Sequence, residues 1–321
     1  MRLSWGSQRL RRRDLPGGPF RRDVSMAETF LKYLQYEKRY SPRTLVSYET
    51  DLRQFEEFLQ KEFESKSQDA NYGMIRGWIV SLSEQKLEAP SINRKMACLR
   101  SYYKFLRRRE EITKDPMLKV KVLKGKKKLP HFVNENEIIH MLDTQTPDNK
   151  KTELEVLRDR LVIEMFYGTG MRLSELIGLR DRDINLRDRT VKVLGKRNKE
   201  RVIPFAVGIV SLIERYRDVR NRDVERKEPE NFFVTKEGKK LYPVLVNRIV
   251  KKGLKGTNVE KKSPHVLRHT YATHLLNKGA DLNAVKDLLG HTSLAATQVY
   301  THNTIEKLKE VFNKAHPKSG Q

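Results

Sequence analysis

Side chains that could bind an anion or a metal ion gather near the C-terminal end of the sequence. Five of the eight histidines lie there, together with one arginine and one tyrosine: His265, His269, His274, His291, His302, Arg268 and Tyr300. Imidazole is the commonest protein ligand for transition metals, and together with arginine it can also hold a phosphate group. The cluster therefore raises two alternatives, a metal centre and an anion site.

A zinc site is the weaker alternative. His265 and His269 stand four residues apart, as two metal ligands on one helical face do. No acidic residue lies between them, however, and Arg268 would place a permanent cation beside the metal. The sequence also lacks the P-loop pattern and any group of Asp and Glu residues at ligand spacing. We therefore expect no bound metal, no ATP and no other cofactor.

An anion site explains the same residues better. Ser263 and Pro264 predict the start of a helix, and His265 and Arg268 then fall on one face of its first turn, where the helix dipole favours negative charge. Arginine adds a planar fork of donors that stays protonated. Arg172, which precedes another expected helix, is a second candidate of this kind. Taken alone, it could equally be an ordinary surface arginine.

The overall charge indicates the kind of anion. Sixty-six Lys and Arg residues against 41 Asp and Glu residues give a net charge of +25, which favours a nucleic acid as partner.

No stretch is apolar enough to cross a membrane, so an integral membrane protein is excluded. The single cysteine, Cys98, excludes an internal disulfide and indicates a reducing compartment. We expect a cytoplasmic protein.

The stretch 26–112 predicts an all-helical domain. Ser41 followed by Pro42 is typical of a helix start. The apolar residues that follow repeat at helical spacing and define one stripe: Leu45, Tyr48, Leu52, Phe55 and Leu59.

Residues 1–25 hold seven arginines against two aspartates and no apolar periodicity, which predicts a disordered basic leader. The leader could be an upstream extension, with Met26 as the true start, or a transit peptide.

A cationic helix face and a cationic connector follow. In the helix expected from Ser91, basic side chains lie opposite the apolar ones: Arg94, Arg100, Lys104, Arg107 and Arg108. Residues 107–128 carry ten basic and three acidic residues, and Pro116 and Gly125 prevent one continuous helix. We expect a basic linker over 113–129. These residues, with Arg43, are candidate DNA contacts, although a solvated surface and a flexible linker would give the same pattern.

The second domain, 130–321, is expected to be mixed. The patterns predict helices at about 134–143, 155–168, 172–179, 206–222, 243–251, 264–277, 281–289 and 292–300. Two β-rich runs, Thr190–Leu194 and Arg201–Phe205, flank a six-residue turn and predict an antiparallel hairpin. A last amphipathic helix is expected after Thr304, where Ile305, Leu308 and Phe312 share one face.

Five motifs in this order resemble the signature of the tyrosine recombinases, the phage integrase family. They are the run Thr169–Leu176, then Gly195 with Lys196, then the run His265–His269, then the run Leu289–His291, and last Tyr300. Within that family the chain is most similar to the Xer site-specific recombinases, which the stretch Tyr40–Tyr48 also resembles. The likeness spans about residues 26–315, so it leaves out only the leader and the tail.

The resemblance implies a role for each matched residue. Arg172 and Arg268 would bind the scissile phosphate, and His291 would donate a hydrogen bond to it. Lys196 would protonate the leaving 5′ oxygen, His265 would assist proton transfer, and Tyr300 would be the nucleophile. Glu175 matches an acidic residue that orients the site. Arg197 stands where many relatives have glycine, which leaves Lys192 and Lys199 as alternatives for the acid.

The resemblance also implies fold, reaction and partners. We expect a mainly α protein, with an all-helical core-binding domain and an α+β catalytic domain that has a small antiparallel sheet, together forming a C-shaped DNA clamp. The implied activity is site-specific recombination through a 3′-phosphotyrosyl intermediate and a Holliday junction, with chromosome dimer resolution favoured over integration of a mobile element. The expected partners are a duplex recombination site and a homotetramer, or a heterotetramer with a paralogous recombinase. The tail helix would dock onto its own domain or onto a neighbouring protomer.

Two further functions remain open from the sequence. A type IB topoisomerase shares the tyrosine chemistry but relaxes supercoiled DNA as a monomer. A DNA-binding protein without activity could retain the fold, although every expected reactive residue is present.

Overall fold

The computed structural model describes residues 25–124, 132–143, 151–195, 200–225 and 228–290. The chain divides into two compact units, residues 1–128 and 129–321. No helix within these described ranges is both long and apolar enough to span a bilayer. The expected leader, the helix at 292–300 and the tail helix lie outside the described residues.

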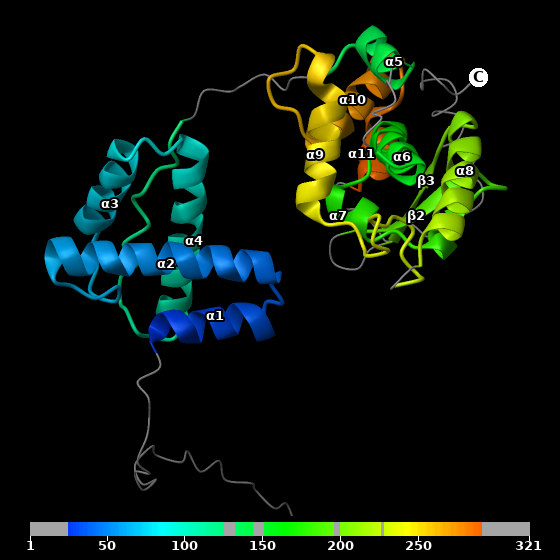
Figure 1. The fold of residues 1–321 in the computed structure, drawn as a ribbon. Coiled ribbons are helices and arrows are strands. Elements are labelled where there is room, and N and C mark those ends of the chain that lie inside the picture. The colour runs from blue at the N-terminus through cyan, green and yellow to red at the C-terminus, as the bar shows by residue number, and fades with distance from the viewer. Residues whose placement is uncertain (1–24, 125–131, 144–150, 196–199, 226–227, 291–321) are drawn as a thin grey trace, which may run out of the picture. The chain divides into compact units, whose positions relative to one another are not determined.

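The N-terminal unit is all-helical, as the apolar periodicity predicts. Its helices are α1 (Met26–Tyr36), α2 (Pro42–Phe63), α3 (Tyr72–Glu84) and α4 (Ala89–Arg108) (Figure 1). Ser41 caps α2 by accepting a hydrogen bond from the backbone N–H of Thr44, and Pro42 occupies the first turn. The start predicted for α4 at Ser91 is two residues late, because Pro90 already fits the first turn after Glu88.

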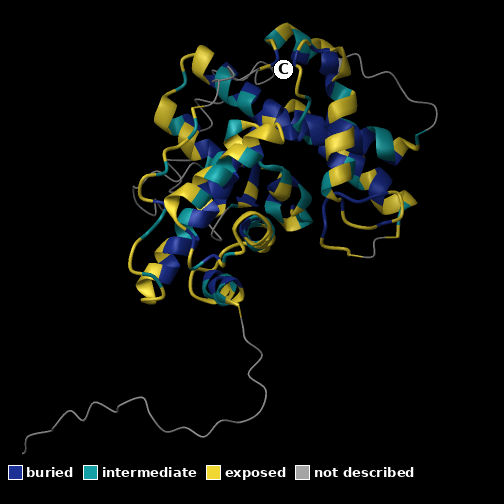
Figure 2. Ribbon diagram, turned by 90° about the vertical axis from the view of Figure 1, so that its left-hand side faces the viewer, coloured by how far each residue is buried: buried dark blue, intermediate teal, exposed yellow. Residues whose placement is uncertain are grey.

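Aromatic side chains fill the core of the N-terminal unit. Leu52, Phe55 and Leu59 of the predicted stripe are buried, and the Phe55 ring packs against Trp78 of α3 and Tyr103 of α4. Figure 2 shows the buried and exposed residues alternating along the helices, so that each helix turns one face inward. Burial of that face is what holds short helices of this kind together.

The first part of the expected linker packs on the N-terminal unit. The Asn93 side chain of α4 donates a hydrogen bond to the carbonyl of Leu123 and accepts one from its N–H, both at 2.9 Å. Arg100 donates to the carbonyl oxygen of Val120, and Met117 is buried in the helical core. The chain is therefore held against the helical unit as far as Leu123, because Met117, Val120 and Leu123 pack on its core.

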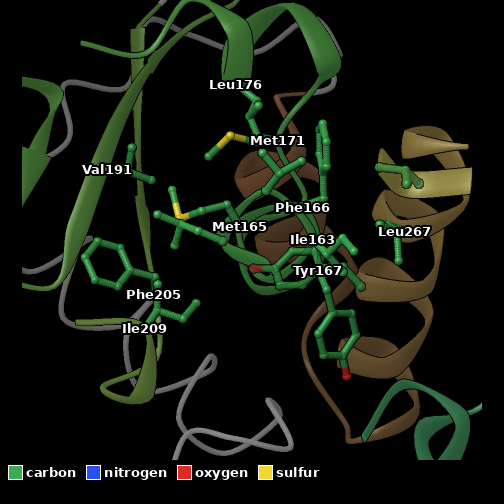
Figure 3. Packing of buried hydrophobic residues seen from close by; sticks show 14 of the residues in the cluster. Ile163, Met165, Phe166, Tyr167, Met171, Leu176, Val191, Phe205, Ile209 and Leu267 are labelled. Carbon is green, nitrogen blue, oxygen red and sulfur yellow. The ribbon is translucent and has the colours of Figure 1, made fainter. Parts of the chain in front are cut away.

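The second unit is mixed and centres on one buried helix. Its helices are α5 (Glu135–Asp143), α6 (Glu153–Thr169), α7 (Leu173–Ile177), α8 (Gly208–Asp223), α9 (Pro243–Gly253), α10 (Pro264–Asn277) and α11 (Leu282–Leu289), with short 3-10 turns at Asp181–Asp183 and Leu254–Gly256. Helix α6 begins at a capping box between Thr152 and Glu155. Figure 3 shows Met165 and Phe166 of α6 among side chains from the sheet, α7, α8 and α10.

A small antiparallel sheet covers part of this core. It has the order β1-β2-β3, with β1 at Ile184–Asn185, β2 at Thr190–Leu194 and β3 at Glu200–Pro204. Strand β2 matches its prediction, whereas β3 begins one residue earlier than predicted because Glu200 still pairs with Leu194. Strand β1 was not predicted, since two residues are too few to show an alternating pattern. The helical and α+β units confirm the predicted fold class.

Candidate active site

Arg172 lies directly after the sharp end of α6. Helix α6 ends at Thr169 and is capped by Gly170, whose φ of +60° lies in the left-handed region. Arg172 is the N-cap residue of α7. A β-carbon on Gly170 would stand 2.5 Å from the ring of Tyr271. Only glycine meets both conditions without strain. Its turn directs the chain toward α7, where Glu175 accepts hydrogen bonds from the N–H of Arg172 at 2.6 Å and from its Nη1 at 2.8 Å.

Arg268 reaches the same place from α10. Its side chain is buried and donates from Nη1 to the carbonyl oxygen of Gly170 at 2.6 Å and from Nη2 to that of Leu289 at 2.5 Å. Burial, followed by the positive charges of Arg172 and Arg201, lowers the pKa of Arg268 to about 10. The group is still protonated near pH 7, so the protein holds a desolvated cation here.

The C-terminal end of α11 brings three arginines together. The carbonyl oxygens of three consecutive residues accept hydrogen bonds: Leu288 from Arg201 Nε at 2.8 Å, Leu289 from Arg268, and Gly290 from Arg172 Nη2 at 3.0 Å. The last carbonyls of a helix lack partners within the helix and carry partial negative charge, so guanidinium groups suit them. Leu289 and Gly290, the two residues before His291, are therefore fixed beside Arg268 and Arg172.

A buried carboxylate joins two of these arginines. Glu175 also accepts two hydrogen bonds from Arg201, at 2.7 and 2.9 Å. Burial would raise the pKa of the Glu175 carboxyl, but the hydrogen bonds and charge of Arg201, together with the two hydrogen bonds from Arg172, outweigh burial and lower it. Sequence reasoning expected an orienting role for Glu175 but missed Arg201. The alternation along the strand could have indicated it, because Arg201 lies on the same face as Ile203, a core residue, while the neighbouring Glu200 is exposed.

The predicted proton-transfer residues are placed only in part. His265 is exposed in the first turn of α10, and Ser263 occupies the N-cap without a side-chain hydrogen bond. Lys192 of β2 is exposed and lies 3.4 Å from Glu200. No group of three or more potential metal ligands occurs in the part of the chain that the structure describes. The other predicted residues, Lys196, Lys199, His291 and Tyr300, lie outside that part.

The assembled groups carry a net positive charge, as an anion-binding site requires. Three arginine charges face one carboxylate, which leaves an excess of positive charge at the end of α11. Arg201 and Glu175 are almost fully buried, whereas a third of the Arg172 side chain remains exposed. Arg172 is therefore the arginine that faces solvent, and it has N–H groups in addition to those bonded to protein. A phosphate oxygen is a suitable acceptor for them.

The candidate DNA contacts of the N-terminal unit fall into two groups. Arg43, Lys104 and Arg107 are exposed. Arg94 instead forms a two-pronged ion pair with Asp51, a fully buried carboxylate of α2 that also binds Lys95. Arg100 donates to the carbonyl oxygen of Val120. Arg94 is nevertheless exposed, so its contact with DNA and that of Arg100 stay predictions, and both side chains also hold the unit together.

The sequence matches two family descriptions. Residues 114–307 match the Phage integrase family, and residues 27–110 match the Phage integrase, N-terminal SAM-like domain. Among curated proteins, the Tyrosine recombinase XerC of Chlorobaculum parvum is 38% identical over 90% of this chain and 94% of its own. The Tyrosine recombinase XerD of Staphylococcus haemolyticus is 34% identical over 92% of this chain and 99% of its own.

Solved structures with the same fold include a recombinase and an integrase, each bound to DNA. The XerH site-specific recombinase bound to a palindromic difH substrate has a TM-score of 0.68 at 24% identity, covering 88% of this chain and 83% of its own. The Tn1549 transposon integrase in complex with transposon right end DNA also has a TM-score of 0.68, at 18% identity, covering 89% and 99%. From the family matches and the curated relatives, the chain belongs to the phage integrase family and is a tyrosine recombinase, an enzyme that transfers DNA strands.

Proposed function

We propose that this protein recombines DNA at a specific site and that the arginines at the end of α11 hold the phosphate that is cut. The observation that carries the proposal is the convergence of Arg172 and Arg268 on two consecutive carbonyls, those of Gly290 and Leu289. Residues from three segments far apart in sequence thereby form one cationic site. A phosphodiester needs such donors, because negative charge builds up on its non-bridging oxygens during transfer.

The proposed reaction breaks one phosphodiester bond and forms another. The Tyr300 phenol oxygen attacks the phosphorus, the bond to the 5′ oxygen breaks, and the phosphate stays on the enzyme as a 3′-phosphotyrosine. Lys196 supplies the proton that the leaving 5′ oxygen takes up, and His265 assists in removing the phenol proton. Arg172, Arg268 and His291 bind the non-bridging oxygens throughout.

The cationic groups also compensate for a weak nucleophile. A free tyrosine has a pKa of about 10, so ionising it at pH 7 costs roughly 4 kcal/mol. Nearby positive charge lowers that cost. Because the phosphotyrosine retains the energy of the phosphodiester, a 5′ hydroxyl can attack it and reseal a strand without an outside energy source. Exchange of one strand from each duplex at a time produces a Holliday junction.

The proposed partners are a duplex recombination site and further recombinase subunits. The net charge of +25 and the exposed Arg43, Lys104 and Arg107 support contact with the DNA backbone. We propose that both units contact the duplex and that four protomers, identical or from two paralogues, act together. Chromosome dimer resolution as the role fits relatives named XerC and XerD, and we propose the cytoplasm as the place.

Trapping of the covalent intermediate tests the proposal. DNA that crosslinks to the protein in cells identifies the site, and a nicked duplex of that sequence prevents religation. The wild-type chain should form a protein–DNA adduct that resists denaturation, and Tyr300→Phe should bind the duplex without forming it. An adduct retained by Tyr300→Phe would refute the assigned nucleophile. Relaxation of supercoiled plasmid that lacks the site would instead indicate a topoisomerase.

A further inference from the structure

Arg201 is a buried arginine that the proposed reaction does not use. It lies on β3, only 4% of its side chain is exposed, and it contacts both α7 and the end of α11. We infer that Arg201 is a positioning residue for strand cleavage, which sets the place of Arg172 through Glu175. This inference rests on the proposed function, since it assigns Arg172 to the phosphate.

The carboxylate of Glu175 is shared between the two arginines. Its Oε1 accepts from Arg172 Nη1 at 2.8 Å and from Arg201 Nη1 at 2.7 Å. Its Oε2 accepts from the Arg172 N–H at 2.6 Å and from Arg201 Nη2 at 2.9 Å. Arg201 thus uses both prongs of its fork to fix the plane of the carboxylate. That plane in turn sets the backbone and the guanidinium group of Arg172.

The same side chain fixes the end of α11. Arg201 donates from Nε to the carbonyl oxygen of Leu288. Gly290 has a φ of +64°, and a β-carbon there would stand 3.2 to 3.4 Å from the Arg201 side chain. Gly290 is also the residue whose carbonyl accepts from Arg172. Arg201 therefore holds Glu175 directly and the end of α11 through Leu288, so a shift of Arg201 displaces both supports of Arg172.

Replacement of Arg201 by lysine distinguishes the effect of its charge from the effect of its hydrogen-bond geometry. Arg201→Lys keeps a cation beside Glu175, but an ammonium group cannot provide two parallel hydrogen bonds and a third to Leu288 together. A purely structural role would lower the stability of the fold and leave the cleavage rate of the folded protein unchanged. A positioning role also changes that rate, because a small displacement of a group that binds the transition state is costly.

Arg220 provides the matched control. It is another buried arginine of the same unit, and it binds the carbonyl oxygen of Phe232 at 2.7 Å and the carboxylate of Asp181 at 3.2 Å. Both of these partners lie outside α7 and α11. Arg220→Lys therefore makes the same chemical change in a buried arginine whose partners lie outside the candidate site.

The test measures single-turnover adduct formation on the nicked duplex, the Kd for that duplex and the thermal unfolding of each variant. We expect Arg201→Lys to slow adduct formation by about 10- to 100-fold with an unchanged Kd. Arg220→Lys should lower the Tm but form the adduct at the wild-type rate per folded molecule. A wild-type rate for Arg201→Lys, or an equal loss in both variants, would overturn the inference.

A double-mutant cycle tests whether Glu175 transmits the effect. If Arg201 acts through Glu175, the variant with Arg201→Lys and Glu175→Gln should be no slower than the slower single variant. Rate losses that multiply would show that the two residues act independently and would overturn the inference. Failure of the wild-type protein to form any adduct would refute the proposed function instead, so the two failures are distinguishable.

Discussion

The guanidinium groups of Arg172 and Arg268 bind the carbonyl oxygens of Gly290 and Leu289, which are neighbours at the end of α11. Each guanidinium group is thus held in place by hydrogen bonds to the protein, even without DNA. Donors that are already oriented need no rearrangement when charge develops on a phosphate, and such preorganised donors contribute strongly to catalysis.

Removal of either arginine should therefore affect cleavage more than binding. For Arg172→Ala and Arg268→Ala we expect single-turnover cleavage to slow by about 10²–10³-fold, because one donor to the transferring phosphate is lost. Gel-shift titration with the same duplex should give a Kd close to that of the wild type. An equal loss in rate and affinity would mean that the arginines are only backbone contacts.

Gly170→Ala should destabilise the catalytic unit. The substitution places a methyl group 2.5 Å from the Tyr271 ring at a φ of +60°, which we expect to cost about 2 kcal/mol or more in the free energy of unfolding. Gly279→Ala is the control, since Gly279 also has a positive φ but no atom within 4 Å of the place that a β-carbon would take. Chemical denaturation measures both variants, and equal losses would show that the Tyr271 contact carries no cost.

The stability of the catalytic unit should fall as the pH drops below about 6.5, the ordinary pKa of histidine. Burial is the main cause that lowers the pKa of His274, whose Nδ1 lies 3.1 Å from the Tyr167 hydroxyl, while Glu135 partly offsets it. A lowered pKa means that the unfolded chain binds more protons, so this contribution is complete above pH 6.5 and is lost on acidification. The free energy of unfolding, measured at several pH values across this range, should depend less on pH in His274→Gln than in the wild type. Parallel pH profiles for the variant and the wild type would contradict the assignment.

The cationic residues of α4 should separate into two classes. Lys104→Ala should reduce the slope of log affinity against log salt by about one if Lys104 contacts a phosphate. Arg94→Ala should mainly lower the Tm, because it removes a partner from the fully buried Asp51. Salt titrations and thermal melts of both variants measure the difference. A salt slope that falls only in Arg94→Ala would reverse the two assignments.

Local sequence signals predicted most of the helices. The cap at Ser41, the apolar repeat through Leu59 and the paired strands β2 and β3 each depend on residues close in the chain. The link between Arg201, Glu175 and Leu288 could not be predicted in this way, because it joins segments that only the tertiary fold brings together. The tie between Asn93 and Leu123 has the same origin, so a segment rich in lysine was expected to be a free linker.

The candidate site could be predicted from motifs in part only. Arg172 and Arg268 were singled out as anion binders from residue type and position, and the structure brings them together at α11. The roles of Lys196, His265, His291 and Tyr300 stay predictions, since the resemblance supplied them. Arg201 was missed although it shares one face of the strand with Ile203, because that pattern indicates a buried side chain but not the carboxylate and carbonyl groups that it binds.

The most direct test of the whole account is to identify the amino acid that carries the DNA. The adduct formed on the nicked duplex is digested with nuclease and protease, and the modified peptide is sequenced by mass spectrometry. We expect a 3′-linked nucleotide on Tyr300 in the wild-type protein, with far less of it in Arg172→Ala and Arg268→Ala. A nucleotide attached to any other residue would contradict this expectation.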